Sequence, residues 1–287
     1  MSDSRPVGLF DSGVGGLTVS REIFRLLPHE ATVYFGDTAH VPYGSRRVEE
    51  LIGFADQIIA FLISCNVKYI IFACNTNSSL SLPVMRRRYA VPMMGLVEPG
   101  ARLAVELSAN HRIGVIATEA TVKSGAYQRA VKSLNPGITV FAQPAPRLVP
   151  LVETGMPETG EALEAVSKYV QPLKSSGIDT LILGCTHYPF LVSHFQKCLG
   201  PEVKLVDPAA ATVLAARDEI DRLGLLNNPG GTPRHHYFVS GDPEDFRQTA
   251  RQFPGFDALL VQRVVMEETA KNSGEGLARP GVSSHCR

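Results

Sequence analysis

Two cysteines, Cys74 and Cys185, stand in matching sequence settings that favour a chemical role for both. Each ends a short apolar run, Tyr69 to Ala73 or Thr180 to Gly184, and each is followed by hydroxyl-bearing residues that open a helix-like stretch. The carboxyl ends of parallel strands form the ligand-binding edge of an α/β sheet, where the following helices point their N–H groups and positive dipole ends. We therefore expect both thiols to face one cleft.

A thiol at that edge is suited to proton transfer. The helix dipole and backbone donors favour the thiolate, which is expected to bring the ordinary thiol pKa of about 8.5 toward neutral pH. Inverting a carbon stereocentre requires removal of a proton from one face and delivery of another to the opposite face, so two positioned acid–base groups suit that task. The pair predicts an enzyme that inverts a stereocentre.

The remaining cysteines, Cys65, Cys198 and Cys286, are interpreted as bystanders. The first two lie within or near helical patterns, where a thiol behaves as a small apolar side chain. No C-x-x-C pair is present, which argues against a zinc ribbon. Thiol redox chemistry stays an alternative function, and we expect no metal site.

A glycine-rich turn and an aspartate leave a second hypothesis open. Gly13-Val14-Gly15-Gly16 follows the first apolar run and could form a backbone nest for a carboxylate or phosphate. Asp37 ends the second run, at roughly the spacing of a dinucleotide-binding fold. An NAD-binding enzyme is therefore the competitor, although Thr18 stands where the fingerprint needs its third glycine.

Short apolar runs alternate with amphipathic stretches, which predicts an α/β fold with mostly parallel strands. Helices are expected at Arg46 to Cys65, around Leu163 to Leu173, and after Asp207-Pro208, because apolar residues there recur at helical spacing. Strands are expected at Val7–Phe10, Thr32–Phe35, Tyr69–Ala73, Ile113–Ala117, Ile138–Ala142, Thr180–Leu183, Val203–Val206, His236–Ser240 and Ala258–Val261.

Length and charge narrow the class of protein. The chain has 287 residues, which favours two lobes of ordinary size over one core. Lys plus Arg and Asp plus Glu each number 28, so no net charge attracts nucleic acid or anionic lipid. No apolar run reaches membrane-spanning length. We predict a cytoplasmic protein that binds neither nucleic acid nor membranes.

The motif spacing indicates an internal repeat. Cys74 and Cys185 are 111 positions apart, and Asp11 and Thr118, which follow two other predicted strands, are 107 apart. A duplicated α/β unit produces such near-equal offsets. We predict two pseudo-symmetric α/β lobes with a cleft between them, formed by residues 1–96 plus 207–270 and by residues 97–206. Residues 271–287, rich in Gly and Ser, are predicted to be a mobile tail.

Seven motifs together resemble the glutamate racemases and, more loosely, the wider aspartate/glutamate racemase superfamily. The resemblance runs from about Val7 to Arg263. It implies two α/β lobes, no cofactor, a homodimer, and interconversion of L- and D-glutamate by two cysteines to supply D-glutamate for peptidoglycan. The motifs are GLFDSGVGGLT, YFGDTAHVPYGSR, ACNTNS, GLVEPGA, IGVIATEATVKSGAY, ILGCTHYPFL and LVDPAAA.

The resemblance also implies roles for individual residues. Cys74 would handle the proton of the D-enantiomer and Cys185 that of the L-enantiomer. Asp11 beside the first thiol and His187 beside the second would assist, with Glu153 as a further helper. Substrate contacts would come from Asp11, Ser12, Tyr43, Gly44, Asn75, Thr76, Thr118, Thr121, Thr186 and His187.

Two further alternatives stay open. A related racemase specific for aspartate differs only in pocket depth, because the two substrates differ by one methylene. A non-catalytic binding protein would hold the ligand in the cleft without exchanging its α-hydrogen.

Overall fold

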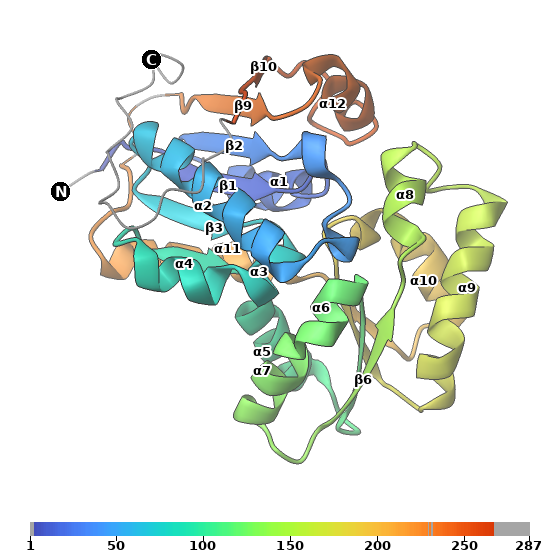
Figure 1. Ribbon diagram of the computed structural model, residues 1–287. Coiled ribbons are helices and arrows are strands. Elements are labelled where there is room, and N and C mark those ends of the chain that lie inside the picture. The colour runs from blue at the N-terminus through green and yellow to red at the C-terminus, as the bar shows by residue number, and fades with distance from the viewer. Residues whose placement is uncertain (1–2, 229, 231, 267–287) are drawn as a thin grey trace.

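The computed structural model describes residues 3–228, 230 and 232–266 (Figure 1). Its strands form two parallel sheets, in agreement with the predicted fold class. The predicted tail, 271–287, lies outside the described residues. The six-stranded sheet has the order β10-β9-β2-β1-β3-β4, and it consists of β1 (Val7–Asp11), β2 (Thr32–Gly36), β3 (Tyr69–Phe72), β4 (Met93–Gly95), β9 (His235–Val239) and β10 (Val261–Arg263).

The second sheet has four strands in the order β6-β5-β7-β8. It repeats the order β2-β1-β3-β4 of the first sheet, so the expected duplication of an α/β unit is confirmed at the level of topology. The chain enters this sheet after β4 and leaves it after β8. The lobe boundaries at residues 96 and 206 stay a prediction. The strands are β5 (Arg112–Ala117), β6 (Thr139–Pro144), β7 (Thr180–Gly184) and β8 (Lys204–Val206).

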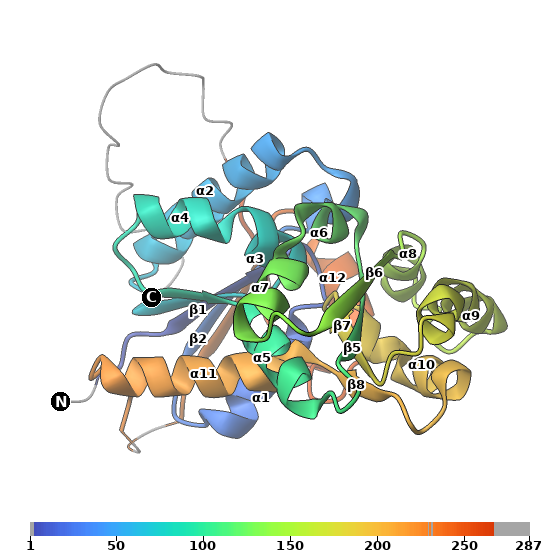
Figure 2. The same ribbon diagram turned by 90° about the horizontal axis from the view of Figure 1, so that it is seen from below.

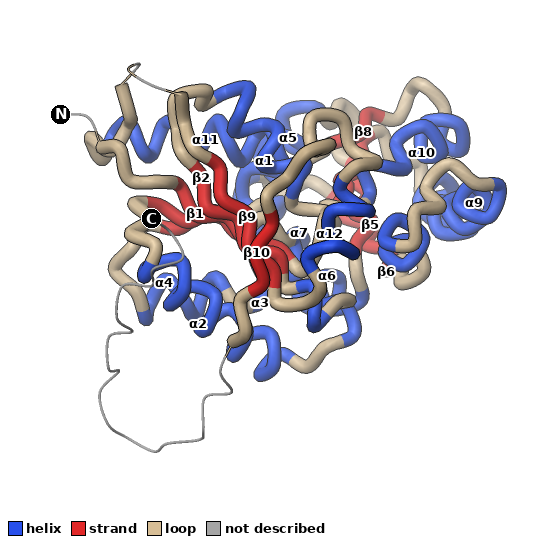
Figure 3. Tube along the Cα trace, turned by 90° about the horizontal axis from the view of Figure 1, so that it is seen from above, coloured by secondary structure: helices blue, strands red, loops and turns tan. Residues whose placement is uncertain are grey.

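Helices cover both faces of the first sheet (Figures 2 and 3). α1 (Leu17–Leu26) and α11 (Pro208–Arg222) lie on one face, and α2 (Val48–Ser64) and α4 (Leu82–Arg88) lie on the other. The predicted apolar stripe of α2 is buried at Leu51, Ala55, Ile58, Ile59 and Leu62. The last four of these residues join a cluster with strand residues that include Phe10, Phe35 and Phe72.

The second sheet is also covered on both sides (Figure 2). α5 (Val97–Leu107) and α7 (Ala126–Leu134) pack on one face, and α9 (Gly160–Ser175) and α10 (Val192–Leu199) lie on the other. None of the helices in the described part of the chain is long and apolar enough to cross a membrane. The shorter elements are η1 (Thr38–His40), η2 (Tyr43–Ser45), α3 (Asn75–Leu80), α6 (Glu119–Ser124), α8 (Leu148–Glu153), η3 (Tyr188–Leu191) and α12 (Pro243–Ala250).

Two strands differ from their sequence-based predictions by more than two residues at either end. The run Ala258–Val261 predicts a strand, but β10 begins only at Val261, so that prediction is wrong for the residues before it. Pairing decides the position, because Val261 lies opposite Tyr237 of β9 while Leu260 is 88 % exposed. The second difference is β4, which the sequence does not predict because three residues are too short to show a period.

Candidate active site

The carboxyl ends of strands from both sheets meet at one cavity of about 240 Å³. β3 leads into Cys74 and β7 leads into Cys185, and both thiols line this cavity. The expectation that the two cysteines face one cleft is thus met. Of the predicted site residues, those that line the cavity are Ser12, Tyr43, Gly44, Cys74, Asn75, Thr76, Thr118, Cys185, Thr186 and His187. Asp11, Thr121 and Glu153 do not line the cavity. They contact the lining residues Thr186, Thr76 and His187, respectively.

Each cysteine sits at a strand-to-helix turn. Cys74 is in extended conformation and precedes α3, and its carbonyl accepts the Ser78 N–H at 2.8 Å. The carbonyl of Cys185 accepts the Tyr188 N–H at 3.1 Å, at the start of the turn that becomes η3. Both thiols are free and buried. Both cysteines therefore stand at hydrogen-bonded turns between a strand and a helix.

The surroundings of Cys74 favour its protonated form. Burial raises the thiol pKa well above its usual range, and the nearby Asp11 carboxyl raises it further. Burial also raises the pKa of Asp11, whose Oδ2 accepts the Gly16 N–H at 2.7 Å. The expected lowering of the thiol pKa is wrong for Cys74, because desolvation and a neighbouring carboxyl outweigh the dipole of a six-residue helix.

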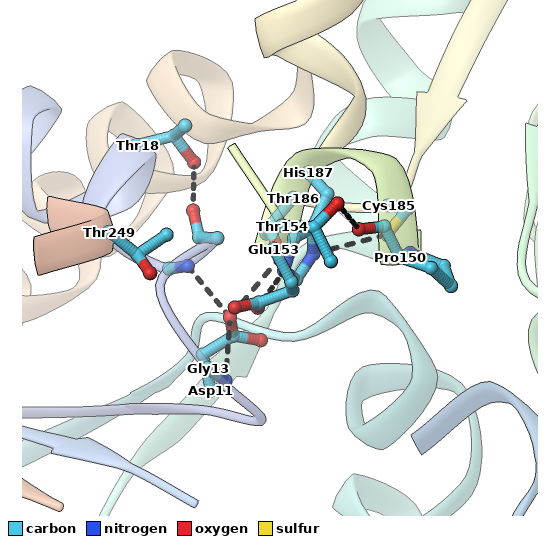
Figure 4. A network of polar contacts seen from close by, with 12 residues as sticks. Asp11, Gly13, Thr18, Pro150, Glu153, Thr154, Cys185, Thr186, His187 and Thr249 are labelled. Atoms are coloured by element: carbon cyan, nitrogen blue, oxygen red, sulfur yellow. Dashed lines mark hydrogen bonds and ion pairs between the residues drawn. The ribbon is translucent and has the colours of Figure 1, made fainter. Parts of the chain in front are cut away.

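Cys185 heads a chain of polar contacts with His187 and Glu153 (Figure 4). Its Sγ lies 3.6 Å from His187 Nδ1, and His187 Nε2 lies 2.5 Å from Glu153 Oε1. Burial lowers the pKa of His187, but the contacts with Cys185 and Glu153 more than offset burial and hold that pKa well above its ordinary value. The His187 contact in turn keeps the pKa of Glu153 low despite burial. The imidazole is therefore held as a cation.

The two thiols consequently face opposite electrostatic surroundings. Cys74 is placed beside a carboxyl group, which opposes negative charge on its sulfur. Cys185 is placed beside the imidazole of His187, whose pKa is held well above its ordinary value. Such a pair can present a proton donor and a proton acceptor to the same ligand.

Three threonine hydroxyl groups, on segments that follow β3 and β5, form a hydrogen-bonded cluster. Thr76 Oγ1 lies 2.9 Å from Thr118 Oγ1 and 3.2 Å from Thr121 Oγ1, and the latter two oxygens are 2.9 Å apart. Thr76 belongs to α3, whereas Thr118 is the N-cap of α6 and Thr121 lies in its first turn. This cluster supplies hydrogen-bond donors of the kind that bind a carboxylate.

Asp37, the acidic residue of the NAD-binding hypothesis, is hydrogen-bonded to other residues of the chain. It is buried, and its carboxylate accepts hydrogen bonds from the Tyr43 hydroxyl and from Ser240 Oγ, the latter at 2.6 Å. His40 Nδ1 lies 2.8 Å from the same carboxylate. These contacts hold the turn that carries Tyr43 over the cavity and leave Asp37 engaged within the chain. The carboxylate that the NAD-binding hypothesis assigned to a ribose is therefore already hydrogen-bonded within the chain.

Five cavity-lining residues escape prediction from the sequence. Signals exist for three of them, which lie inside the quoted motifs next to predicted residues. The other two are a proline just before α8 and a valine within it, and nothing in the sequence distinguishes them from core residues. The residues are Pro42, Ser45, Glu119, Pro146 and Val149. No cluster of three or more His, Cys, Asp or Glu side chains able to hold a metal occurs in the described ranges.

Comparison with known proteins shows the family. The Asp/Glu/hydantoin racemase family matches residues 15–216. The chain belongs to this family. A glutamate racemase of Desulforudis audaxviator is 60 % identical over 266 residues, which span 91 % of this chain and 97 % of that protein.

Solved structures of racemases agree with this membership. The glutamate racemase isoform RacE1 from Bacillus anthracis superposes with a TM-score of 0.86 at 34 % identity, over 91 % of this chain and 97 % of that one. The glutamate racemase from Francisella tularensis, solved in complex with D-glutamate, gives 0.85 at 33 % identity, over 92 % and 99 %. The chain is an amino-acid racemase, which is an isomerase.

Proposed function

We propose that this racemase interconverts L- and D-glutamate by a two-base mechanism in which Cys74 and Cys185 act on opposite faces of the α-carbon. The observation that carries the proposal is that both thiols line one cavity in opposite electrostatic surroundings. In the direction from L to D, the Cys185 sulfur removes the α-proton and the Cys74 thiol delivers a proton to the other face. The reverse direction exchanges these roles.

Carbanion stabilisation is the demanding part of this reaction, because the α-hydrogen of an amino acid is weakly acidic. Hydrogen bonds to the substrate carboxylate, made in a site shielded from water, lower that barrier. Donors of this kind line the cavity, and we propose that they hold the substrate without a cofactor. They are Ser12, Asn75, Thr76, Thr118 and Thr186, with Tyr43 and Gly44 closing the cavity and Thr121 supporting the threonines.

The assisting residues divide between the two thiols. Asp11 is proposed to take part in proton transfer at Cys74, with which it shares a hydrogen bond. His187 is proposed to stabilise the Cys185 thiolate, and Glu153 to hold the His187 cation. Glu153 is a positioning residue in this scheme, since its carboxylate contacts the imidazole and lies outside the set that lines the cavity.

The cellular role is part of the same proposal. Relatives that are named glutamate racemases support D-glutamate as a product, and we propose that this D-glutamate is used for peptidoglycan synthesis. We also propose a cytoplasmic location, a homodimer, and two lobes formed by residues 1–96 with 207–270 and by residues 97–206.

Proton NMR of the purified, reduced protein with L-glutamate in deuterated water tests this function. Loss of the α-hydrogen signal together with loss of optical activity, without added cofactor, is the expected result. The same assay with L-aspartate tests the alternative that the protein is a racemase specific for aspartate. A folded protein that binds glutamate without exchanging its α-hydrogen would instead be a binding protein, and activity that depends on the redox state of a cysteine pair would indicate thiol redox chemistry.

A further inference from the structure

Tyr127, on α7, makes a hydrogen bond to the element that carries the first thiol. Its hydroxyl donates to Asn75 Oδ1 at 2.6 Å, and Asn75 is the residue that follows Cys74. Tyr127 is 1 % exposed and lies outside the set of residues that line the cavity. It therefore acts on the cavity through Asn75.

The Tyr127 hydroxyl determines which way the Asn75 amide faces. A side-chain amide has one acceptor oxygen and one donor nitrogen, so a donor bound to Oδ1 leaves the N–H₂ group for other partners. Asn75 Nδ2 is buried and has no hydrogen-bond partner among the described residues. Because a buried donor without a partner is costly, a ligand in the cavity that Asn75 lines is the natural acceptor.

The ring of Tyr127 lies near Gly184, the residue before the second thiol. A Cβ atom placed on Gly184, the residue before Cys185, would lie 3.3 Å from Tyr127 Cε2. A Cβ atom on Gly100 would lie 3.5 Å from the Tyr127 hydroxyl. Tyr127 therefore lies close to the residue before Cys185 while its hydroxyl bonds to the residue after Cys74.

We propose that Tyr127 is a positioning residue for racemisation: its hydroxyl orients the Asn75 amide toward the substrate carboxylate. The inference rests on the proposed function, since it assigns a carboxylate ligand to Asn75. A phenylalanine would fill the same apolar cluster, which includes Val97, Ala101 and Val131. The hydroxyl is therefore the part that serves the substrate.

The test is Tyr127→Phe, which removes the hydroxyl and keeps the ring. We expect KM for L- and D-glutamate to rise and kcat/KM to fall by about tenfold, the usual scale for loss of one directed hydrogen bond. The matched control is Tyr69→Phe. Tyr69 is also buried, and its hydroxyl donates to Glu219 Oε2 at 2.5 Å on α11, away from the cavity. The control is expected to alter thermal stability without altering KM.

A double-mutant cycle separates positioning from a general structural effect. If Tyr127 acts through Asn75, Tyr127→Phe has little further effect on kcat/KM once Asn75→Ala is present. Equal losses with and without the Asn75→Ala substitution, or a Tyr127→Phe variant with wild-type KM, would overturn the inference. The wild-type protein runs in the same exchange assay, and absence of exchange there would overturn the glutamate function and the positioning role together. When the wild type does exchange the α-hydrogen, a failed cycle overturns the positioning role of Tyr127 alone.

Discussion

The backbone of Gly13 lies directly against the carboxylate of Glu153, so closely that a Cβ atom on Gly13 would overlap Glu153 Oε1. Gly15 makes the equivalent approach to His187, because a Cβ atom there would lie 2.7 Å from His187 Nδ1. The Val14 N–H also donates to Glu153. The sequence suggests that this glycine turn could bind a carboxylate or phosphate. In the structure the turn lies against a carboxylate of the chain itself, that of Glu153, and against the His187 imidazole.

Substitution at this turn tests the importance of the close approach. Gly15→Ala is expected to displace His187 and reduce kcat by about 100-fold, since displacements near 1 Å can cost that much. The matched control is Gly53→Ala on α2, where a Cβ atom meets nothing within 4 Å. That control should retain activity and gain about 0.5–1 kcal/mol in free energy of unfolding. Steady-state kinetics measure kcat and thermal unfolding measures stability for both variants. A normal kcat in Gly15→Ala would contradict the argument that a Cβ atom at this position displaces His187.

Removal of either thiol tests the two-base mechanism. Cys74→Ala and Cys185→Ala are each expected to lower racemisation by at least about 10²–10⁴-fold, the range for loss of one acid–base group, with the fold intact. Cys198→Ala, which removes a free cysteine on α10, is the control and should match the wild type. Circular dichroism at substrate and protein wavelengths reports turnover and folding. Near-normal turnover by either single variant would rule out the two-base mechanism.

The pH profile should respond to Glu153→Gln. The wild-type contacts with Cys185 and Glu153 hold the pKa of His187 high, so the cation persists as the pH rises. Without the Glu153 charge, His187 loses its proton at a lower pH, and the alkaline limb of kcat/KM should move down by about 1–3 pH units. Glu158→Gln, which changes an exposed carboxylate on the following turn, is the control. An unshifted limb would show that this carboxylate does not hold the cation.

A buried ion pair far from the cavity should affect stability alone. Lys68 Nζ lies 2.6 Å from Glu30 Oε2 and donates to the Asp3 carbonyl at 2.6 Å. Lys68→Met leaves Glu30 as an unpaired buried charge and should cost about 3–5 kcal/mol of unfolding free energy with KM unchanged. Arg88→Met, which removes a more exposed ion pair with Asp56, should cost less than about 1 kcal/mol. Denaturant titration distinguishes the two, and equal costs would contradict the argument from burial.

The site could be located from the sequence because the end of each strand is visible in the local pattern of apolar residues. Because β3 and β7 end just before Cys74 and Cys185, each thiol lies at the carboxyl edge of its parallel sheet. The protonation states depend on contacts that the sequence cannot display. Asp11 and Cys74 are 63 positions apart, and only the packing of β1 beside β3 brings them together to raise the pKa of the thiol.

The sequence does not predict correctly the elements whose positions depend on pairing or contact with distant parts of the chain. β10 is placed by its pairing with β9, and β4 by its pairing with β3, since neither is long enough to show a period. Tyr127 lies inside one of the quoted motifs, yet its contact with Asn75 spans two helices that follow strands of different sheets. Its role becomes visible only once the two sheets are placed against each other.

The position of β9 has a consequence for the order in which the protein matures during synthesis. β2 pairs with β1 on one side and with β9 on the other, but the whole second sheet is encoded between β2 and β9. As the chain leaves the ribosome, one edge of β2 keeps its N–H and C=O groups unpaired until His235–Val239 have been translated. The second sheet, by contrast, is assembled from one uninterrupted stretch. The nascent chain therefore carries an open strand edge through most of translation, and such an edge can pair with other chains and aggregate.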